Sequence, residues 1–227
     1  MTDFFRFPHT PHLVWLGSAP PRDDKVLPPA EANALLLRDV TVEEKLDGAN
    51  LGISVDSDCQ LRFQNRGEYL VPPFTGQFAR LNGWAGRHSI DLVANLGPGL
   101  ILFGEWCAAR HSVAYDALPD WFAAFDVYDR SAGKFWSVGR RIALATQLGV
   151  AVVPRLSSGR TTLNVLIALA ATGESRFGHS RLEGLVVRRD GPEWLEGRAK
   201  IVRPNFLQNM DEHWRRRHIE WNRVTFA

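Results

Sequence analysis

Short apolar segments separated by polar turns recur along the chain, and this pattern is typical of a protein rich in β-strands. Apolar residues are spaced through residues 40–55 on both sides of a charged centre, whereas residues 100–103 form a continuous apolar run that indicates a buried strand. The turn at Asp190-Gly191 lies between two further segments and predicts an antiparallel hairpin. The segments expected to contain strands are residues 12–16, 31–70, 100–103, 121–129, 151–154, 182–189 and 194–202.

Other segments place apolar residues three or four positions apart, which predicts helices. Phe74, Phe78, Leu81 and Trp84 follow this spacing in the first of them. A mixture of such helices with antiparallel strands predicts an α+β fold, in which largely antiparallel sheets are flanked by helices. The segments expected to be helical are residues 73–94, 138–149, 162–171 and 208–224, and Thr161 or Thr162 is expected to cap the third of them.

The domain organisation follows from the length of the chain and from the lack of a linker. A chain of 227 residues can form one large domain or two small ones, and no linker-like segment divides it. We therefore expect a single domain over residues 1–227. Residues 1–30 are rich in proline and aromatic residues and are expected to form an arm laid across it, and residues 207–227 a short basic C-terminal helix.

Composition and charge narrow the class of protein. The chain is 45% hydrophobic and 23% charged, as an ordinary globular protein is, and its net charge of +2 is too small to indicate nucleic-acid binding by itself. Its two cysteines lie outside any CxxC motif and are expected to stay reduced, which points to a cytoplasmic location. The chain has no apolar run of about 18 residues, so no membrane span is expected.

Charged residues stand where the apolar strands are expected to end. Lys45, Glu105, Asp126 and Glu183 each have this position, and a neighbouring strand supplies Lys200. Burying such groups without partners is costly, so they either share one polar site or face water separately. In the first case, carboxylates that hold a metal ion and cations that bind phosphate would make a phosphate-and-metal site. In the second, they are scattered surface charges.

Five short motifs, in this order, resemble those of the covalent nucleotidyltransferases, the superfamily of DNA ligases, RNA ligases and mRNA capping enzymes. The resemblance covers residues 40–206 and is greatest to the ATP-dependent RNA ligases of the RNA ligase 2 type. It implies a nucleotidyltransferase (ATP-grasp-like) domain. The motifs read KLDGAN at 45–50, NRG at 65–67, FGE at 103–105, FDVYD at 125–129 and EGLV at 183–186.

The resemblance implies a set of nucleotide-binding roles. Lys45 matches the catalytic lysine that forms a covalent phosphoramide with AMP. Glu44 matches a residue whose backbone reads the adenine, and Glu105 a glutamate that binds the ribose hydroxyls. Phe125 and Val186 match the aromatic and apolar residues on the two faces of the adenine.

The remaining matched residues are implied to act on phosphate, metal and RNA. Asp47 completes the first motif as a catalytic residue, and Lys200 matches a catalytic lysine that binds phosphate. Arg66 matches an arginine that contacts both the nucleotide and the 5′-phosphate of the RNA, and Asn50 an asparagine near the RNA end. Glu183 matches the glutamate of the metal site.

The chain departs from the family at its last motif, which is usually Lys-x-Lys. Here Arg198 or Arg203 could supply the second cation, and Arg203 is favoured because it stands three residues before Phe206. The sequence ends about 20 residues after this motif, so no C-terminal OB-fold is expected. Pyrophosphate would then be oriented by the charged turn at residues 22–25 or by the arginines at residues 215–217.

The resemblance implies ATP and Mg²⁺ or Mn²⁺ as cofactors. It implies RNA with 5′-phosphate and 3′-hydroxyl ends as the substrate, and enzymes that heal RNA ends as further partners. The reaction requires a neutral amine at Lys45, whose pKa nearby cations such as Lys200 and Arg203 are expected to lower. A DNA ligase or nick sealer, and an inactive nucleotide- or RNA-binding module, are the alternative functions.

Overall fold

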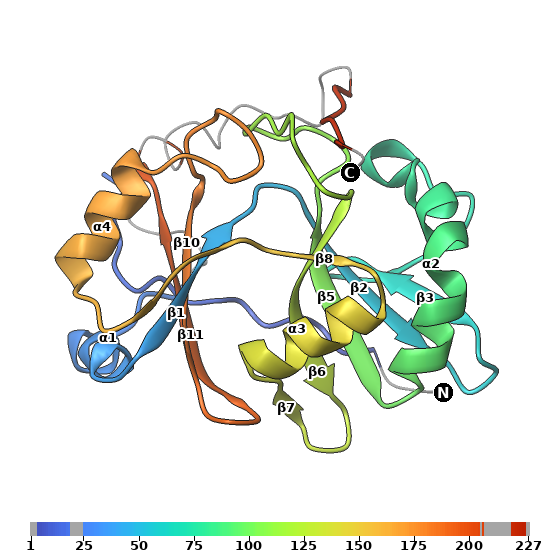
Figure 1. Ribbon diagram of the computed structural model, residues 1–227, viewed down its shortest axis with the longest axis horizontal. Helices are drawn as coiled ribbons and strands as arrows, with labels where there is room; N and C mark the ends of the chain where they lie inside the picture. The colour runs from blue at the N-terminus through green and yellow to red at the C-terminus, as the bar shows by residue number, and fades with distance from the viewer. Residues whose placement is uncertain (1–3, 19–24, 205, 207–218, 226–227) are drawn as a thin grey trace.

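Two β-sheets lie side by side in the protein, and helices cover their outer faces (Figure 1). The computed structural model describes residues 4–18, 25–204, 206 and 219–225. The expected α+β fold with largely antiparallel sheets is confirmed, because every pairing except that of β8 with β6 is antiparallel. That the chain is a single domain stays a prediction.

The first sheet has the strand order β11-β10-β1-β9. Helices α1 and α4 pack on it and bury an aliphatic cluster that includes Leu166, Leu185 and Ile201. The predicted hairpin is formed by β10 and β11. The elements are α1 (Pro29–Leu36), β1 (Val40–Lys45), β9 (Arg155–Gly159), α4 (Leu163–Thr172), β10 (Gly184–Asp190) and β11 (Leu195–Val202).

The second sheet has the order β4-β3-β2-β5-β6-β7, with β8 beside β6. Helices α2 and α3 cover it over a core that contains Trp84, Trp106 and Phe122. The elements are β2 (Ala49–Val55), β3 (Leu61–Gln64), β4 (Tyr69–Leu70), the 3-10 helix η1 (Gly76–Phe78), α2 (Leu81–Leu96), β5 (Leu100–Trp106), β6 (Phe122–Asp129), β7 (Lys134–Phe135), α3 (Val138–Gln147) and β8 (Ala151–Val152).

The chain crosses from one sheet to the other between β1 and β2. Strand β1 ends at Lys45 in the first sheet, and β2 begins at Ala49 in the second. Residues 46–48 therefore bridge the two sheets. This places Lys45 at the inner edge of the first sheet, where the two sheets face each other.

Several helix and strand predictions are confirmed, and others are wrong. Thr162 caps α4 as expected, since its hydroxyl accepts from Val165 N at 3.4 Å. Residues 29–36 form a helix where strands were expected, and the first long helix begins at Leu81, after the short η1. Strand β9 was not predicted, and residues 12–16 form no strand but pair through isolated bridges of His12 with Val26 and Lys200.

The predicted basic C-terminal helix is not seen where the chain is described. Residues 207–218 lie outside the described residues. Residues 219–225 are irregular, and Trp221 and Val224 form isolated bridges with Ala109 and Leu118. Backbone groups of the loop between β5 and β6 hold this segment, since Arg110 N donates to Glu220 O at 2.8 Å and Leu118 N donates to Arg223 O at 3.1 Å. Long-range contacts therefore decide its conformation. Within the described part of the chain, no helix is long and apolar enough to cross a membrane.

Candidate functional site

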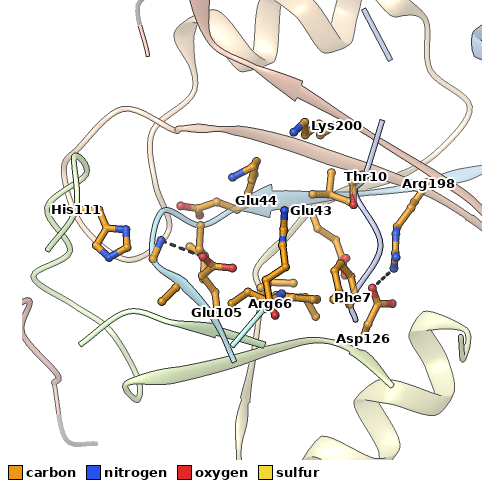
Figure 2. A pocket seen from close by; sticks show the side chains of 18 of the residues that line it. Phe7, Thr10, Glu43, Glu44, Arg66, Glu105, His111, Asp126, Arg198 and Lys200 are labelled. Atoms are coloured by element: carbon orange, nitrogen blue, oxygen red, sulfur yellow. Dashed lines mark hydrogen bonds and ion pairs between the residues drawn. The ribbon is translucent and has the colours of Figure 1, made fainter. Parts of the chain in front are cut away.

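A cavity of about 530 Å³ opens between the two sheets, and the link from β1 to β2 forms part of its wall. Such a volume lies in the range of small-molecule sites, roughly 300–1,000 Å³. Figure 2 shows how charged and aromatic side chains from several elements point into it. The sequence-predicted site residues that line it are Glu44, Lys45, Asn50, Arg66, Glu105, Phe125, Val186 and Lys200.

Lys45 stands at the end of β1 near two carboxyl groups, of which Glu183 is buried and Glu105 half-buried. Its Nζ lies 2.5 Å from Glu183 Oε1. Burial acts to lower the pKa of Lys45, but the negative charges of Glu183 and Glu105 outweigh it and raise the pKa above its usual value. The expectation that nearby cations lower this pKa is therefore wrong for the ligand-free site, in which Lys45 is an ammonium.

The two carboxyl groups beside Lys45 are hard to ionise. Burial raises the pKa of Glu183 to about 8, against the attraction of Lys45. Burial likewise raises the pKa of Glu105 to about 7, although Glu105 also accepts from Gly48 N at 3.1 Å. Each acid is therefore stabilised as a carboxylate when a positive charge lies close to it. In the ligand-free site, Lys45 supplies that charge.

Asp47, predicted to be catalytic, does not line the cavity. Its Oδ2 accepts from Ser112 N at 2.6 Å and from Val113 N at 2.7 Å. Its own N–H donates to the Tyr115 hydroxyl at 2.8 Å. The structure thus shows Asp47 fixing the loop that follows β5, and this anchoring also holds the chain next to Lys45 in place.

Glu44 uses its side chain in the same way. The carboxylate accepts from Ser175 Oγ at 2.5 Å and from Arg176 N at 2.9 Å. The main-chain N–H of Glu44 already donates to Pro154 O at 2.9 Å. These bonds engage Asp47 and Glu44 elsewhere, although the charge of Asp47 still helps to raise the pKa of Lys45.

Gly48 is required by the close approach of two chain segments. A Cβ atom at this position would lie 2.5 Å from Trp106 O, which is backbone and cannot turn aside. Gly48→Ala is therefore expected to lower the free energy of unfolding by about 1–3 kcal/mol, as overpacking does. Chemical denaturation measures this. Gly83→Ala is the control, because its Cβ would meet nothing within 4 Å on helix α2; equal stabilities for the two variants would contradict the prediction.

At the far side of the cavity, Phe125 on β6 and Val186 on β10 supply half-buried apolar surface from opposite sheets. Val153 and Phe78 add further apolar lining. Flat apolar walls suit the two faces of a planar base. The structure thus brings Phe125 and Val186 into one cavity with Lys45, as the sequence predicted.

Asn50 and Arg66 provide polar groups without a complete set of protein partners. Asn50 pairs with Glu105 across β2 and β5, so both side chains are presented together. Among the described residues, Asn50 Oδ1 is buried and has no hydrogen-bond partner. Arg66 is exposed on the turn after β3 and extends over the cavity, as Figure 2 shows. A bound ligand would satisfy these groups.

The last motif differs from the prediction in its second cation. Lys200 and Arg198 lie two positions apart on β11 and both line the cavity. Arg203 comes after the strand ends and lines a separate cavity with Arg181. The structure therefore places Arg198, and not the favoured Arg203, beside Lys200. The charged residues at 22–24 and at 215–217 lie outside the described residues.

A buried charge network at the base of the cavity was not predicted. Asp126 lies in the middle of β6 and not at a strand end as expected, with Arg188 Nη1 2.7 Å from its Oδ1. Arg198 pairs with its other oxygen. Glu43 on β1 binds Arg141 of α3 through both carboxylate oxygens, and each side chain is at most 2% exposed. In the sequence, the only sign of this network is a charged residue inside an otherwise apolar segment.

The site offers limited ligands for a metal ion. Within the described ranges, no group of three or more His, Cys, Asp or Glu side chains is arranged to hold one. Glu183 Oε2 is nevertheless buried and has no hydrogen-bond partner among the described residues. Mg²⁺-type sites commonly use one or two carboxylates together with substrate phosphates. The donor set therefore fits a metal ion that arrives with a phosphate ligand.

Comparisons with solved structures find the RNA ligase of Naegleria gruberi. A variant solved with ATP and Mn has a TM-score of 0.66 and 20% identity, covering 92% of this chain and 59% of that chain. A ligand-free variant has a TM-score of 0.62 and 24% identity, with coverages of 79% and 53%. The ligase solved with pyrophosphate has a TM-score of 0.60 and 23% identity, with coverages of 78% and 53%.

The chain thus spans little more than half the length of the ligase chains it matches. No curated protein sequence matches it. A sequence model described as RNA ligase matches residues 38–202, which is most of the chain and includes every motif in the cavity. The chain therefore belongs to the RNA ligase family.

Proposed function

We propose that this protein is an ATP-dependent RNA ligase that joins a 5′-phosphate end to a 3′-hydroxyl end through a lysyl-AMP intermediate. The observation that carries the proposal is the position of Lys45. Its amine stands in a nucleotide-sized cavity that has apolar walls for a base and cations for phosphates. Structural relatives solved with ATP and Mn, and with pyrophosphate, support this reading.

The reaction has three steps. The Nζ of Lys45 attacks the α-phosphorus of ATP, so that an N–P bond forms and the bond to pyrophosphate breaks. The AMP group then moves from Lys45 to the 5′-phosphate of the RNA. Finally, a 3′-hydroxyl attacks that activated phosphate, the two ends are joined, and AMP leaves. The chain's own residues orient each group, as positioning accounts for most of phosphoryl-transfer catalysis.

In the proposed complex, each part of ATP has its own place in the cavity. Phe125 and Val186 hold the adenine between them, and Glu105 accepts hydrogen bonds from the ribose hydroxyls. Lys200, which stands opposite Val186 on the neighbouring strand of the first sheet, neutralises the phosphates. Lys45 then meets the α-phosphate at the junction between the base end and the acidic end of the cavity.

Arg66 and Asn50 lie where an RNA end would approach Lys45. Arg66 is exposed and offers a fork of donors to a 5′-phosphate. Asn50 presents a buried oxygen that has no partner among the described residues. Asp47 acts indirectly, because it anchors the loop beside Lys45 and does not enter the cavity.

Glu183 is the candidate ligand for Mg²⁺ or Mn²⁺. When bound there, the metal ion would neutralise phosphate oxygens and favour the neutral form of Lys45 through its positive charge. Glu183 is also the residue that pairs with Lys45 in the ligand-free site. Binding of a metal would therefore compete with that ion pair and release the amine.

The expected product assay uses RNA strands held next to each other on a complementary splint. With ATP and Mn²⁺, the protein should join a 5′-phosphate strand to a 3′-hydroxyl strand, because only a 5′-phosphate can accept AMP. Denaturing electrophoresis measures joining. A matched strand with a 5′-hydroxyl is the control and should not be joined. Comparing the joining of single-stranded and nicked RNA then shows which end geometry the protein prefers.

The same assay with DNA strands tests the alternative enzyme. Joining of DNA ends alone would contradict the proposal and favour a DNA nick sealer. Binding of ATP and RNA without any joining would favour an inactive module. Enzymes that leave 5′-phosphate and 3′-hydroxyl ends would be natural partners, because the ligase needs both. The free thiols Cys59 and Cys107 suit a reducing compartment such as the cytoplasm.

A further inference from the structure

We infer that the N-terminal arm, defined here as residues 4–18, is a working part of the nucleotide site, in which Phe7 positions the base-stacking Phe125. The match to the family begins at residue 38, so the arm lies outside it. Two arm residues, Phe7 and Thr10, nevertheless line the same cavity as Lys45. Figure 2 shows both on one stretch of chain, next to Arg198 and Asp126. The inference rests on the proposed function for the identity of the ligand.

Phe7 makes the contacts of a core residue while it lines the cavity. It is 4% exposed, and its ring meets Phe125 edge-on, with the ring centroids 5.2 Å apart. On its other sides it packs on Phe103 and Phe135, at centroid distances of 4.9 Å and 5.5 Å. Aromatic rings in this arrangement prefer a defined mutual angle. Phe7 therefore fixes the orientation of the ring proposed to stack on the base.

Phe7 also connects Phe125 with the charge network. The guanidinium of Arg198 lies 4.5 Å from the Phe7 ring centroid and 4.4 Å from that of Phe135. Arg198 pairs with Asp126, the residue that follows Phe125 on β6. The arm thus completes a set of contacts around the part of the cavity that is proposed to bind the base. Phe7, which makes these contacts, lies outside the family motifs.

The arm is bonded to the first sheet at the phosphate-binding lysine. Lys200 N donates to Pro11 O at 2.8 Å, and Leu13 N donates to Lys200 O at 2.7 Å. Both backbone groups of Lys200 on this side are therefore held by the arm. Strand β11 is the outer strand of its sheet. The arm therefore hydrogen-bonds to the free side of β11 at Lys200, where a further strand would otherwise pair.

The arm is bonded to the second sheet as well. Gln64 on β3 is fully buried and donates from Nε2 to Phe5 O at 2.8 Å. The Phe5 ring stacks on Tyr128 of β6, with centroids 3.7 Å apart. One short segment is thus fastened to both walls of the cavity, on either side of Phe7. It therefore ties the first sheet, which carries Val186 and Lys200, to the second sheet, which carries Phe125.

The test is the affinity of the full chain for adenosine, AMP and ATP, measured by calorimetry on a Lys45→Ala background so that no covalent step intervenes. Phe7→Ala is expected to weaken binding of all three ligands about tenfold, because the defect lies at the base end. Phe7→Leu keeps an apolar side chain of similar reach and should recover part of the affinity. Phe74→Ala is the matched control. Phe74 has the same kind of edge-on contact, with Phe63, but does not line the cavity.

The melting temperature of each variant separates stability from binding. If Phe74→Ala lowers the melting temperature as much as Phe7→Ala does and still binds ATP with wild-type affinity, the weaker binding of Phe7→Ala reflects a change in the site and not a loss of stability. Unchanged adenosine affinity in both Phe7 variants would overturn the inference. A loss of affinity for ATP alone would also overturn the inference, because it would locate the defect at the phosphates. A wild-type chain that binds ATP but gains no AMP would refute the proposed function and leave the role of the arm standing.

Discussion

Replacing Lys45 by alanine is expected to abolish the mass increase of one AMP that the wild-type chain should show after incubation with ATP and Mn²⁺. The reason is that Lys45, and not the other cavity amine Lys200, is the group proposed to attack the α-phosphorus, since it lies beside the acidic groups. Lys45→Arg should fail equally, because a guanidinium keeps the charge but is not deprotonated in proteins and cannot attack phosphorus. Intact-mass spectrometry measures both variants directly.

Lys134→Ala is the matched control for this experiment. Lys134 is exposed on β7 and does not line the cavity, so its loss should leave the AMP adduct unchanged. An adduct that persists in Lys45→Ala would show that another group carries the AMP, and the assignment of Lys45 would be wrong. Mg²⁺ in place of Mn²⁺ tests whether the site accepts both metals.

Removal of one member of the buried charge network should give the largest loss of stability. Glu43 and Arg141 are each 1% exposed and are joined through both carboxylate oxygens. Glu43→Ala leaves the guanidinium buried without this partner, so the free energy of unfolding should fall by about 3–5 kcal/mol. Denaturation by urea measures the change. The double variant Glu43→Leu with Arg141→Met should recover most of it, because an apolar pair leaves no unpaired charge.

An exposed ion pair provides the control for the network. Arg110 Nη1 lies 2.8 Å from Glu220 Oε2, but both side chains are largely accessible, at 44% and 66% exposure. Glu220→Ala should change the free energy of unfolding by less than about 1 kcal/mol, as exposed pairs do. A loss of that small size in Glu43→Ala would mean that water or a rearranged acidic neighbour such as Asp190 compensates for the missing carboxylate.

Local patterns in the sequence predicted most elements whose residues carry their own signals. The periodicity of α3, the threonine cap of α4 and the turn at Asp190-Gly191 are examples. Helix α1 also carries a signal, since Pro29 stands at its first turn and good helix formers follow, but the prolines around it were interpreted as part of the arm. Strand β9 is mostly polar and exposed, so only its pairing with β1 defines it.

The candidate site was predicted only where short motifs mark it. Lys45, Glu105 and Lys200 belong to such motifs, and the structure brings them to one cavity. The partners of Asp47 and Glu44 could not be predicted, because they lie 65 or more residues away along the chain. The pKa of Lys45 was misjudged for a related reason. The charges nearest to Lys45 depend on how the two sheets face each other. The sequence alone does not give the distance between them.

The position of the arm on β11 also bears on how the protein behaves at high concentration. An outer strand presents unpaired N–H and C=O groups and can act as a template for strands of other chains, which leads to aggregation. At Lys200 these groups are occupied by Pro11 and Leu13 of the same chain. The arm therefore shields this point of the sheet edge from strands of other copies of the chain.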